Sequence, residues 1–369
     1  MKYLMIIAIT LMAFTSPEKT INSENKIQIA LLLDTSNSMD GLIEQAKGKL
    51  WSIVNEFGRY EKDKNVPDLE IALFEYGNDG LKAGDDWIRQ ITAFTTDLDF
   101  ISEKLFELRT YGGSEYCGAV IHDANKSLEW SNRKDDLRLI FIAGNEGFNQ
   151  GGFNYKDACQ EAKGKDITVN TIFCGDYEQG IRELWKEGAL ITNGKYINID
   201  QDRSVSYIET PYDKDIDRLN DQLNDTYIWY GRGGADKKIN QSRQDANASS
   251  FSPANKAERA VSKSSDNYKN AHWDAVDAID EGNVELDELV KEEYIAPELK
   301  NKSKEEIAIY LKEKKSEREN IQKEITALNK KRMAYISNQS KDNENTLESA
   351  ITLAVKELAT AKGFRLKVQ

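Results

Sequence analysis

Apolar residues gather in six short runs over the first 200 residues, and each run has the length of a buried strand. Most of the gaps between the runs carry apolar residues at helical spacing. Strands that alternate with helices indicate a mostly parallel sheet covered by helices on both faces. The predicted strands are residues 27–33, 69–76, 87–94, 137–143, 167–174 and 195–199.

One connection between these runs is too short to hold a helix. Only the glycine-containing, charged stretch 77–86 separates the second run from the third. A parallel pair of strands needs a longer crossover, so these two runs are expected to form an antiparallel hairpin. The sequence therefore predicts an α/β fold in which one strand of a six-stranded sheet runs against the others.

The pattern changes after the predicted sheet. Residues 213–226 carry an apolar stripe of helical period and are expected to form the last helix of the α/β domain. From about residue 231 the composition turns to Gly, Ser, Asn, Gln, Asp and Lys, so we interpret residues 232–253 as a linker or loosely packed wrap. Residues 254–369 are expected to be all-α, with helices near 254–280, 284–290, 304–337 and 347–362.

The helix expected at residues 304–337 is long enough to form a coiled coil. Its apolar residues recur at the three-four spacing of a coiled-coil seam. Lys314, Arg318 and Arg332 fall on the same seam, which favours a helical hairpin or small bundle over a long parallel dimer. We interpret these charged residues as a solvated face. This coiled-coil-like region would serve in partner binding, in spacing or in docking onto the α/β domain.

Candidate chemistry begins directly after the first predicted strand. The segment Asp34-Thr35-Ser36-Asn37-Ser38 places one carboxylate and two hydroxyls on a single turn. Open α/β sheets bind ligands at the carboxyl ends of their strands, which is where this turn is expected to lie. A small cluster of hard oxygen atoms suits Mg²⁺, because this ion needs only one or two carboxylates.

In this arrangement Asp34, Ser36 and Ser38 resemble the first loop of the metal-ion-dependent adhesion site (MIDAS) of von Willebrand factor type A (VWA) domains. The resemblance implies a Rossmann-like VWA domain over residues 24–231, with the antiparallel strand at the edge of the sheet. It also implies a metal ion with an open coordination position, which an Asp or Glu carboxylate of a partner protein completes. Residues 141–146 and 169–175 are similar to secreted or periplasmic bacterial VWA proteins.

Two further loops extend the resemblance. Ser114 stands where VWA domains usually offer a threonine hydroxyl to the metal, with Thr110 as the alternative. Asn145 stands where the third loop usually has an aspartate, so the site loses one of its two formal negative charges. Mg²⁺ or another divalent cation is therefore expected to bind weakly, unless Glu115 or Glu146 restores the charge. These two glutamates are also the residues expected to contact the partner.

The same turn admits other interpretations. A dinucleotide-binding loop needs glycines that residues 34–39 lack. A metal-dependent phosphohydrolase, the enzymatic alternative, would carry a second aspartate where this chain has Ser36. A serine-rich turn that only caps the next helix is a structural alternative. In a further alternative the metal site is degenerate, and a structural or assembly protein acts through its C-terminal helices.

The net charge limits the possible classes of partner, and the N-terminal segment limits the possible cellular compartments. The 369 residues include 50 Lys and Arg against 63 Asp and Glu, and a net charge of −13 argues against a nucleic-acid partner. Residues 1–16 are expected to be a signal peptide, because Lys2 precedes an apolar run shorter than the about 20 residues that span a bilayer. No later segment is apolar enough to cross a membrane. We therefore expect a soluble periplasmic or secreted binding protein that is not an enzyme.

Three cysteines are an odd number for an oxidising compartment. Cys159 and Cys174 are both expected near the carboxyl edge of the sheet, and they are the preferred disulfide pair. Cys117 is the rival partner, and buried free thiols are the alternative to a disulfide.

Overall fold

The computed structural model describes residues 25–202, 207–339 and 346–367. The signal peptide expected at residues 1–16 lies outside the described residues. Among those residues, no helix combines the length and the apolar character that crossing a membrane requires.

A six-stranded sheet forms the centre of the molecule. Its strand order is β4-β3-β1-β5-β6-β7. Every neighbouring pair is parallel except β3 and β4, which are antiparallel, so the reversed strand lies at the edge. The predicted fold class is confirmed. The strands are β1 (Lys26–Asp34), β3 (Asp68–Tyr76), β4 (Ile88–Thr95), β5 (Leu137–Gly144), β6 (Thr168–Cys174) and β7 (Tyr196–Ile199).

The apolar runs form strands because both of their faces are buried. In β1, Ile29 and Leu33 point into the core on one face, whereas Ala30 and Leu32 point into the core on the other. Strand β5 is buried along its whole length. Side chains of a strand alternate between the two faces, so a continuous apolar run fits a sheet that helices cover on both sides.

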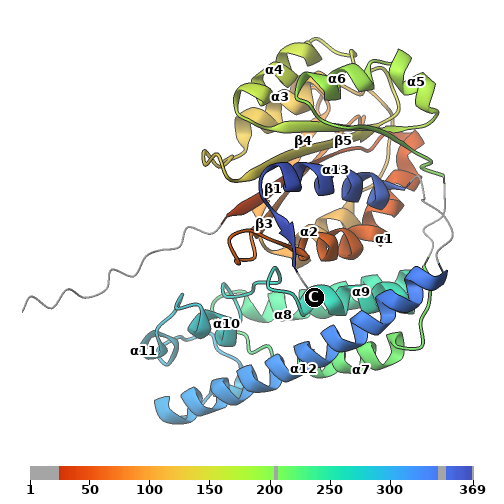
Figure 1. The fold of residues 1–369 in the computed structure, drawn as a ribbon. Helices are drawn as coiled ribbons and strands as arrows, with labels where there is room; N and C mark the ends of the chain where they lie inside the picture. Colours follow the sequence, from red (N-terminus) through yellow and green to blue (C-terminus); the bar gives the residue numbers. More distant parts are fainter. Residues whose placement is uncertain (1–24, 203–206, 340–345, 368–369) are drawn as a thin grey trace, which may run out of the picture.

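Helices are arranged in layers around this sheet (Figure 1). One face is covered by α3 (Cys117–Ser127), α4 (Tyr155–Gly164), α5 (Tyr177–Arg182) and α6 (Trp185–Ile191). The other face is covered by α1 (Asp40–Phe57), α2 (Leu98–Glu107) and α13 (Leu347–Ala361). An additional layer lies below α1 and α2 and contains α7 (Asp213–Asn224), α8 (Gly234–Phe251), α9 (Pro253–Lys263) and α12 (Lys304–Gln339). We call this layer the outer helical layer.

Smaller elements complete the fold. Helices α10 (Ala275–Asp280) and α11 (Leu286–Leu289) lie at one end of the outer helical layer. Strands β2 (Tyr60–Glu61) and β8 (Arg365–Leu366) form a separate antiparallel pair. Short 3₁₀ helices occupy Asn37–Met39, Ala83–Asp85 and Pro297–Leu299.

The linker predicted at residues 232–253 was wrong, because this segment contains helix α8. Its buried face is polar rather than apolar, and it includes Gln241, Gln244 and Asp245. Gln244 accepts a hydrogen bond from Ser102 in α2 (2.8 Å), and Gln241 donates to the Tyr268 hydroxyl (3.1 Å). A helix that buries hydrogen-bonded amides lacks the apolar stripe by which amphipathic helices are identified in a sequence.

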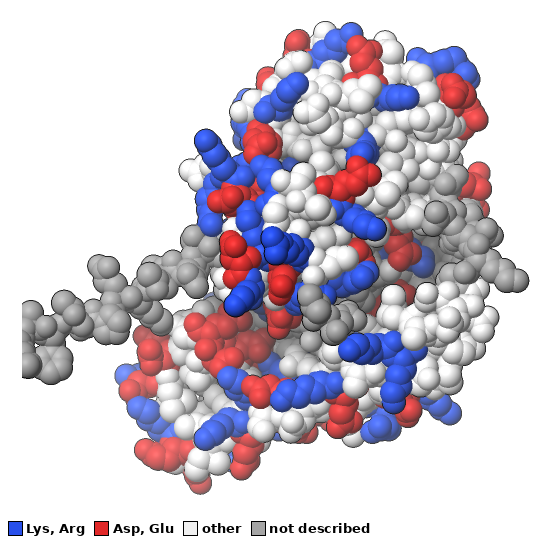
Figure 2. Space-filling view, viewed as in Figure 1, with Lys and Arg blue, Asp and Glu red and all other residues white. Residues whose placement is uncertain are grey.

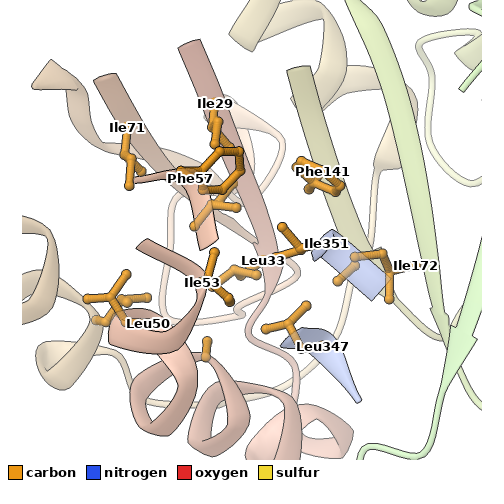
Figure 3. Close-up of a pocket in the computed structure, with 14 residues that line it drawn as sticks. Ile29, Leu33, Leu50, Ile53, Phe57, Ile71, Phe141, Ile172, Leu347 and Ile351 are labelled. Carbon is orange, nitrogen blue, oxygen red and sulfur yellow. The ribbon is translucent and has the colours of Figure 1, made fainter. Parts of the chain in front are cut away.

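The helix expected to complete the α/β domain forms, but it packs elsewhere. Helix α7 contacts α9 and α12 in the outer helical layer. The C-terminal helix α13 instead contacts α1, β5, β6 and β7. Figure 3 shows Leu347 and Ile351 of α13 pointing into a small apolar cavity against Leu33, Ile53 and Ile172. The end of the chain therefore contributes to the core of the sheet, although the C-terminal region was expected to be separate from it.

Two arginines of α12 are buried, so their interpretation as a solvated face was wrong. Arg318 donates to Asp274 (2.8 Å) and to the backbone oxygen of Thr226 (2.7 Å). Arg332 donates to Asp213 (2.8 Å). The apolar seam of α12 packs on α7, α9 and α10 of its own chain. Arg318 and Arg332 thus anchor α12 within the chain rather than to a coiled-coil partner.

The helix boundaries depend on capping residues. Ser303 and Glu306 form a capping box at the start of α12, with N–H to side-chain distances of 2.7 and 3.2 Å. Thr346 and Ser349 form a second capping box at the start of α13. The helix expected at residues 254–280 is two helices, α9 and α10, separated by an irregular segment.

Asp277 should make the stability of the protein depend on pH. Burial, opposed by Arg318 and reinforced by Asp274, raises the pKa of Asp277 from 3.8 to about 7. The folded protein then keeps a proton that the unfolded chain releases. This contribution is complete below the unfolded-state pKa of about 4 and is lost as pH rises to about 7. Urea denaturation at about pH 5 and pH 8 should show this loss, and Asp277→Asn should reduce it. An equal pH dependence in both proteins would contradict the assignment.

Charges of both signs are interspersed over the face shown in Figure 2. Acidic and basic side chains alternate across both the sheet-bearing part and the outer helical layer. Nucleic-acid binding requires a basic face, so this face has the wrong charge pattern for a phosphate backbone.

Candidate metal centre

The first loop of the site begins at the last residue of β1. Asp34 is fully buried, and its Oδ1 accepts a hydrogen bond from the backbone N–H of Ser36 (2.7 Å). The Thr35 N–H donates to the backbone oxygen of Tyr76 (2.9 Å), which ties the turn to the end of β3. These hydrogen bonds fix the Asp34 carboxylate against its own turn, at the carboxyl edge of the sheet.

Hydroxyl and amide groups continue outward from this carboxylate. The hydroxyls of Ser36 and Ser38 share a hydrogen bond of 3.1 Å. The Ser38 oxygen lies 3.1 Å from Asn145 Nδ2 and 3.4 Å from Asn145 Oδ1. The fold thus brings Asp34, Ser36, Ser38 and Asn145 together from two strands. Either end of the Asn145 amide can face the hydroxyl, because the hydroxyl can accept a hydrogen bond from Nδ2 or donate one to Oδ1.

The second loop is bonded to the first along the backbone. The Asn37 N–H donates to Gly112 (2.9 Å), and the Tyr111 N–H donates to Thr35 (2.9 Å). Ser114 is half-buried on this loop. The neighbouring Glu115 is only 4% exposed, and its carboxyl group contacts Asp34. It is therefore the Glu115 carboxyl group that meets the Asp34 carboxylate from the second loop, and ligation by Ser114 stays a prediction.

Glu115 also connects the second loop to the third. The Ser36 side chain and the backbone N–H of Glu146 favour the charged form of the Glu115 carboxyl group and so oppose the rise in its pKa. The Glu146 side chain itself is exposed. The contact with a partner that was predicted for Glu115 does not fit its burial, whereas Glu146 remains accessible.

Burial and the closeness of the two groups disfavour the charged forms of the Asp34 and Glu115 carboxyl groups. Burial is the main cause that raises the pKa of Asp34, and the Glu115 charge adds to it. Burial also raises the pKa of Glu115. Two close carboxylates titrate as a pair, since the first charge disfavours the second. Asp34 Oδ2 has no hydrogen-bond partner among the described residues, so part of this carboxylate is open to another ligand.

Glycines allow the loops to approach Asp34 closely. Gly77 has a φ of +77°, and a Cβ at this position would lie 2.7 Å from Asp34 Oδ1. A Cβ at Gly144 would lie 2.5 Å from the Tyr76 hydroxyl and 3.2 Å from Asp34 Oδ2. A side chain at either position would force the loops apart.

The donor set fits a small divalent cation. It consists of hard oxygen atoms from Asp34, Ser36 and Ser38, with Glu115 and Asn145 beside them. Within the described residues, no group of three or more His, Cys, Asp and Glu side chains is arranged to hold a metal. A site of this kind would therefore depend on hydroxyls as well as carboxylates, which suits Mg²⁺ better than zinc.

The predicted Cys159 and Cys174 disulfide does not form in this structure. Cys117, Cys159 and Cys174 are all buried free thiols. Cys159 lies in the core on one face of the sheet and Cys174 in the core on the other. The sheet itself separates the two residues, which the shared carboxyl edge could not indicate.

Comparisons with known proteins give structural likenesses. No protein-family model matches the chain, and no curated protein matches its sequence. Proximal thread matrix protein 1 from the mussel byssus is similar at 12% identity and a TM-score of 0.37, over 49% of this chain and 43% of its own. The match thus spans less than half of the mussel protein. The same mussel protein has also been solved with a zinc-occupied MIDAS motif.

Two bacterial structures are also similar. BatB from Bacteroides thetaiotaomicron matches at 18% identity and a TM-score of 0.36, over 47% of this chain and 90% of BatB. A von Willebrand factor type A protein from Catenulispora acidiphila matches at 13% identity and a TM-score of 0.36, over 48% and 39% of the two chains. With its one antiparallel edge strand and its Asp-x-Ser-x-Ser turn at the carboxyl end of β1, the α/β part of this chain has the fold of a VWA domain.

Proposed function

We propose that this protein binds another protein through a divalent cation held at the carboxyl edge of its sheet. The observation that supports the proposal is the Asp34 carboxylate, which is fully buried and whose Oδ2 has no hydrogen-bond partner within the part of the chain that the structure describes. Buried charges are normally paired or coordinate a metal. A cation at this carboxylate would balance its charge and occupy the open oxygen.

The residues of the site have separate tasks in this proposal. Asp34 and the hydroxyls of Ser36 and Ser38 hold the ion, with Ser114 and Asn145 as further ligands. Mg²⁺ is the proposed cation, because it accepts neutral oxygen ligands and retains exchangeable positions. One such position receives an Asp or Glu carboxylate of the partner. The exposed Glu146 and Tyr111 lie on the site loops and would contact the partner around this bond.

We also propose that the protein acts in the periplasm or outside the cell, on the basis of the predicted signal peptide. We propose binding rather than catalysis because Ser36 stands two residues after Asp34. A phosphohydrolase of the type considered above would need a second aspartate at that position. Assembly through the C-terminal helices is the competing proposal. It requires an accessible surface on the outer helical layer, such as the exposed Ile309 of α12.

The first test is Mg²⁺ binding by calorimetry. We expect Asp34→Asn to abolish the binding that the wild-type protein shows, because it removes the one carboxylate on the first loop. Asp85→Asn is the matched control, since Asp85 is an exposed acid in the loop between β3 and β4. Equal Mg²⁺ affinity in the wild type and Asp34→Asn would overturn the metal assignment.

Capture of the partner on immobilised protein tests the rest of the proposal. Chelation and Asp34→Asn should weaken capture by the same factor and should not add, because both remove one bond. Capture that survives both changes but is lost in Ile309→Asp would instead favour assembly through the helices.

A further inference from the structure

We propose that Glu115 is the second carboxylate ligand of the metal centre, so that the second loop supplies the negative charge that Asn145 removes from the third. This inference rests on the proposed function and names a residue of the same site.

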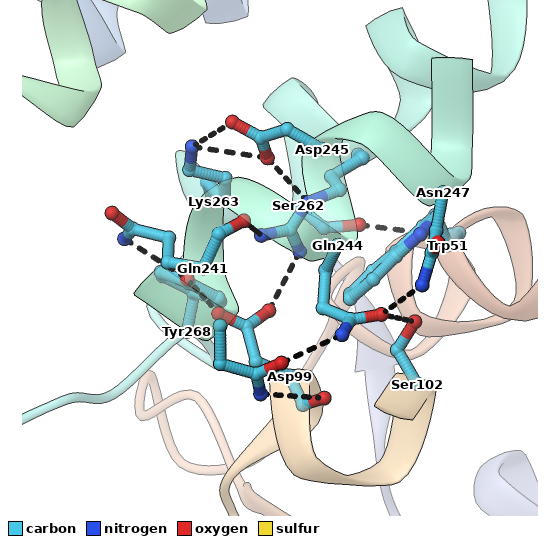
Figure 4. Close-up of polar contacts among 12 residues, drawn as sticks. Trp51, Asp99, Ser102, Gln241, Gln244, Asp245, Asn247, Ser262, Lys263 and Tyr268 are labelled. Carbon is cyan, nitrogen blue, oxygen red and sulfur yellow. Dashed lines mark hydrogen bonds and ion pairs between the residues drawn. The ribbon is translucent and has the colours of Figure 1, made fainter. Parts of the chain in front are cut away.

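Pairing among the other buried acids supports this role. Asp99 and Asp245 both contact Arg259, at 2.7 and 2.5 Å. Figure 4 shows the polar contacts around these two acids. The remaining buried pairs are Glu75 with Arg89, Asp97 with Lys237, Asp136 with Arg133, Asp213 with Arg332 and Asp274 with Arg318. Each of these carboxylates has a basic side chain to balance its charge.

Asp34 and Glu115 are the exception. Over residues 25–202, 207–339 and 346–367, neither forms an ion pair with a lysine, arginine or histidine. They face each other instead. A buried carboxylate without a basic partner is costly, and two in contact are more so, unless a cation joins them. This chain pairs its buried acids consistently, so the missing positive charge at this one position points to a metal ion.

Local packing fixes Glu115 in this place. A Cβ at Gly77 would lie 2.9 Å from Glu115 Cγ, and a Cβ at Gly113 would lie 3.5 Å from Glu115 Oε1. The side chain is therefore enclosed by the loop after β3 and by its own loop. A Cβ at Gly77 would also lie 2.7 Å from Asp34 Oδ1, so the same glycine leaves room for both acids. A glutamate that acted on the site only through its long-range charge could lie on the surface and would not need to be enclosed by two loops.

The site then carries two carboxylates and several neutral oxygen atoms, which is the donor set that Mg²⁺ or Mn²⁺ accepts. Asn145 would lie beside the ion without contributing a charge. The alternative is that Glu115 only shares a hydrogen bond with Asp34 and plays no part in binding the ion.

The experiment compares Mg²⁺ affinity by calorimetry and Mn²⁺ affinity by electron paramagnetic resonance. Glu115→Gln should weaken both by about tenfold or more, since even supporting groups of metal sites act on that scale. Glu178→Gln is the matched control, because Glu178 is an exposed glutamate in α5, after the carboxyl end of β6. The control should bind like the wild type. Adding Asn145→Asp to Glu115→Gln should recover most of the lost affinity.

The outcomes separate this inference from the proposed function. If Asp34→Asn abolishes binding but Glu115→Gln binds as well as the wild type, the metal site stands and the role of Glu115 is wrong. If the wild type binds neither ion, both proposals fail. Thermal unfolding without metal tests for a folding defect. Because Glu115→Gln removes a contact between two acids, the variant should have a melting temperature at or above that of the wild type.

Discussion

Replacing Arg259 with methionine should lower the free energy of unfolding by about 3–5 kcal/mol, because removing one partner of a buried ion pair leaves the others uncompensated. Arg259 of α9 is 0% exposed. It donates to Asp99 in α2 (2.7 Å) and to Asp245 in α8 (2.5 Å), and it stacks over the Trp51 ring in α1 at 4.4 Å. One side chain therefore connects the outer helical layer to two helices that cover the sheet.

Equilibrium urea denaturation would measure the loss. The control is Lys304→Met, which removes an exposed ion pair with Asp287 and should leave the free energy of unfolding nearly unchanged. If the unpaired carboxylates cause the loss, adding Asp99→Asn to Arg259→Met should recover part of it. A cost for Arg259→Met no larger than that of the control would mean that the network does not stabilise the packing of the layers.

Ile351→Asp should destabilise the protein by at least about 3 kcal/mol, since it removes a buried side chain and introduces an unpaired charge. Ile351 of α13 is 1% exposed and points toward the sheet, as Figure 3 shows. Leu353 lies two residues further along the same helix and is 53% exposed. Leu353→Asp is therefore a closely matched control and should change stability by less than about 0.5 kcal/mol.

The same pair of variants tests where α13 belongs. Hydrogen exchange of the β5 and β6 amides should accelerate in Ile351→Asp and stay at the wild-type rate in Leu353→Asp, because α13 contacts these strands. Wild-type exchange rates in both variants would falsify the inclusion of α13 in the core of the sheet.

The sheet could be predicted from the sequence because its signals are local. Continuous apolar runs such as residues 137–143 have few ways to be buried, and a short connection such as residues 77–86 permits only a hairpin. The turn at Asp34 was equally recognisable, since its three oxygen-bearing side chains are adjacent in the chain.

The outer helical layer was harder to predict because its helices bury polar groups. Gln244 is as fully buried as many core isoleucines, and so is Arg259, but only because distant residues satisfy their hydrogen bonds. Arg318 was taken as a solvated residue for the same reason. A buried polar side chain can be identified only when its partner is known, and these partners come from other parts of the chain.

Glu115 illustrates the same limit within the site. The sequence placed it next to Ser114 as a source of charge, but its burial depends on Gly77 and on the Glu146 backbone, which belong to other loops. The gathering of Asp34, Ser36 and Ser38 on one turn was therefore predictable, whereas the place of the Glu115 carboxyl group beside them was not.

The place of α13 in the sheet has a consequence for how the protein is made. The Leu347 N–H donates to Gln45 across 302 positions of the sequence, so the first helix meets its last neighbour only when almost the whole chain exists. Contacts of such long sequence separation slow folding, and a nascent chain cannot form them early. We therefore expect the polypeptide to leave the ribosome without a finished core. A nonsense mutation anywhere ahead of residue 347 should then yield no folded fragment rather than a shorter working protein.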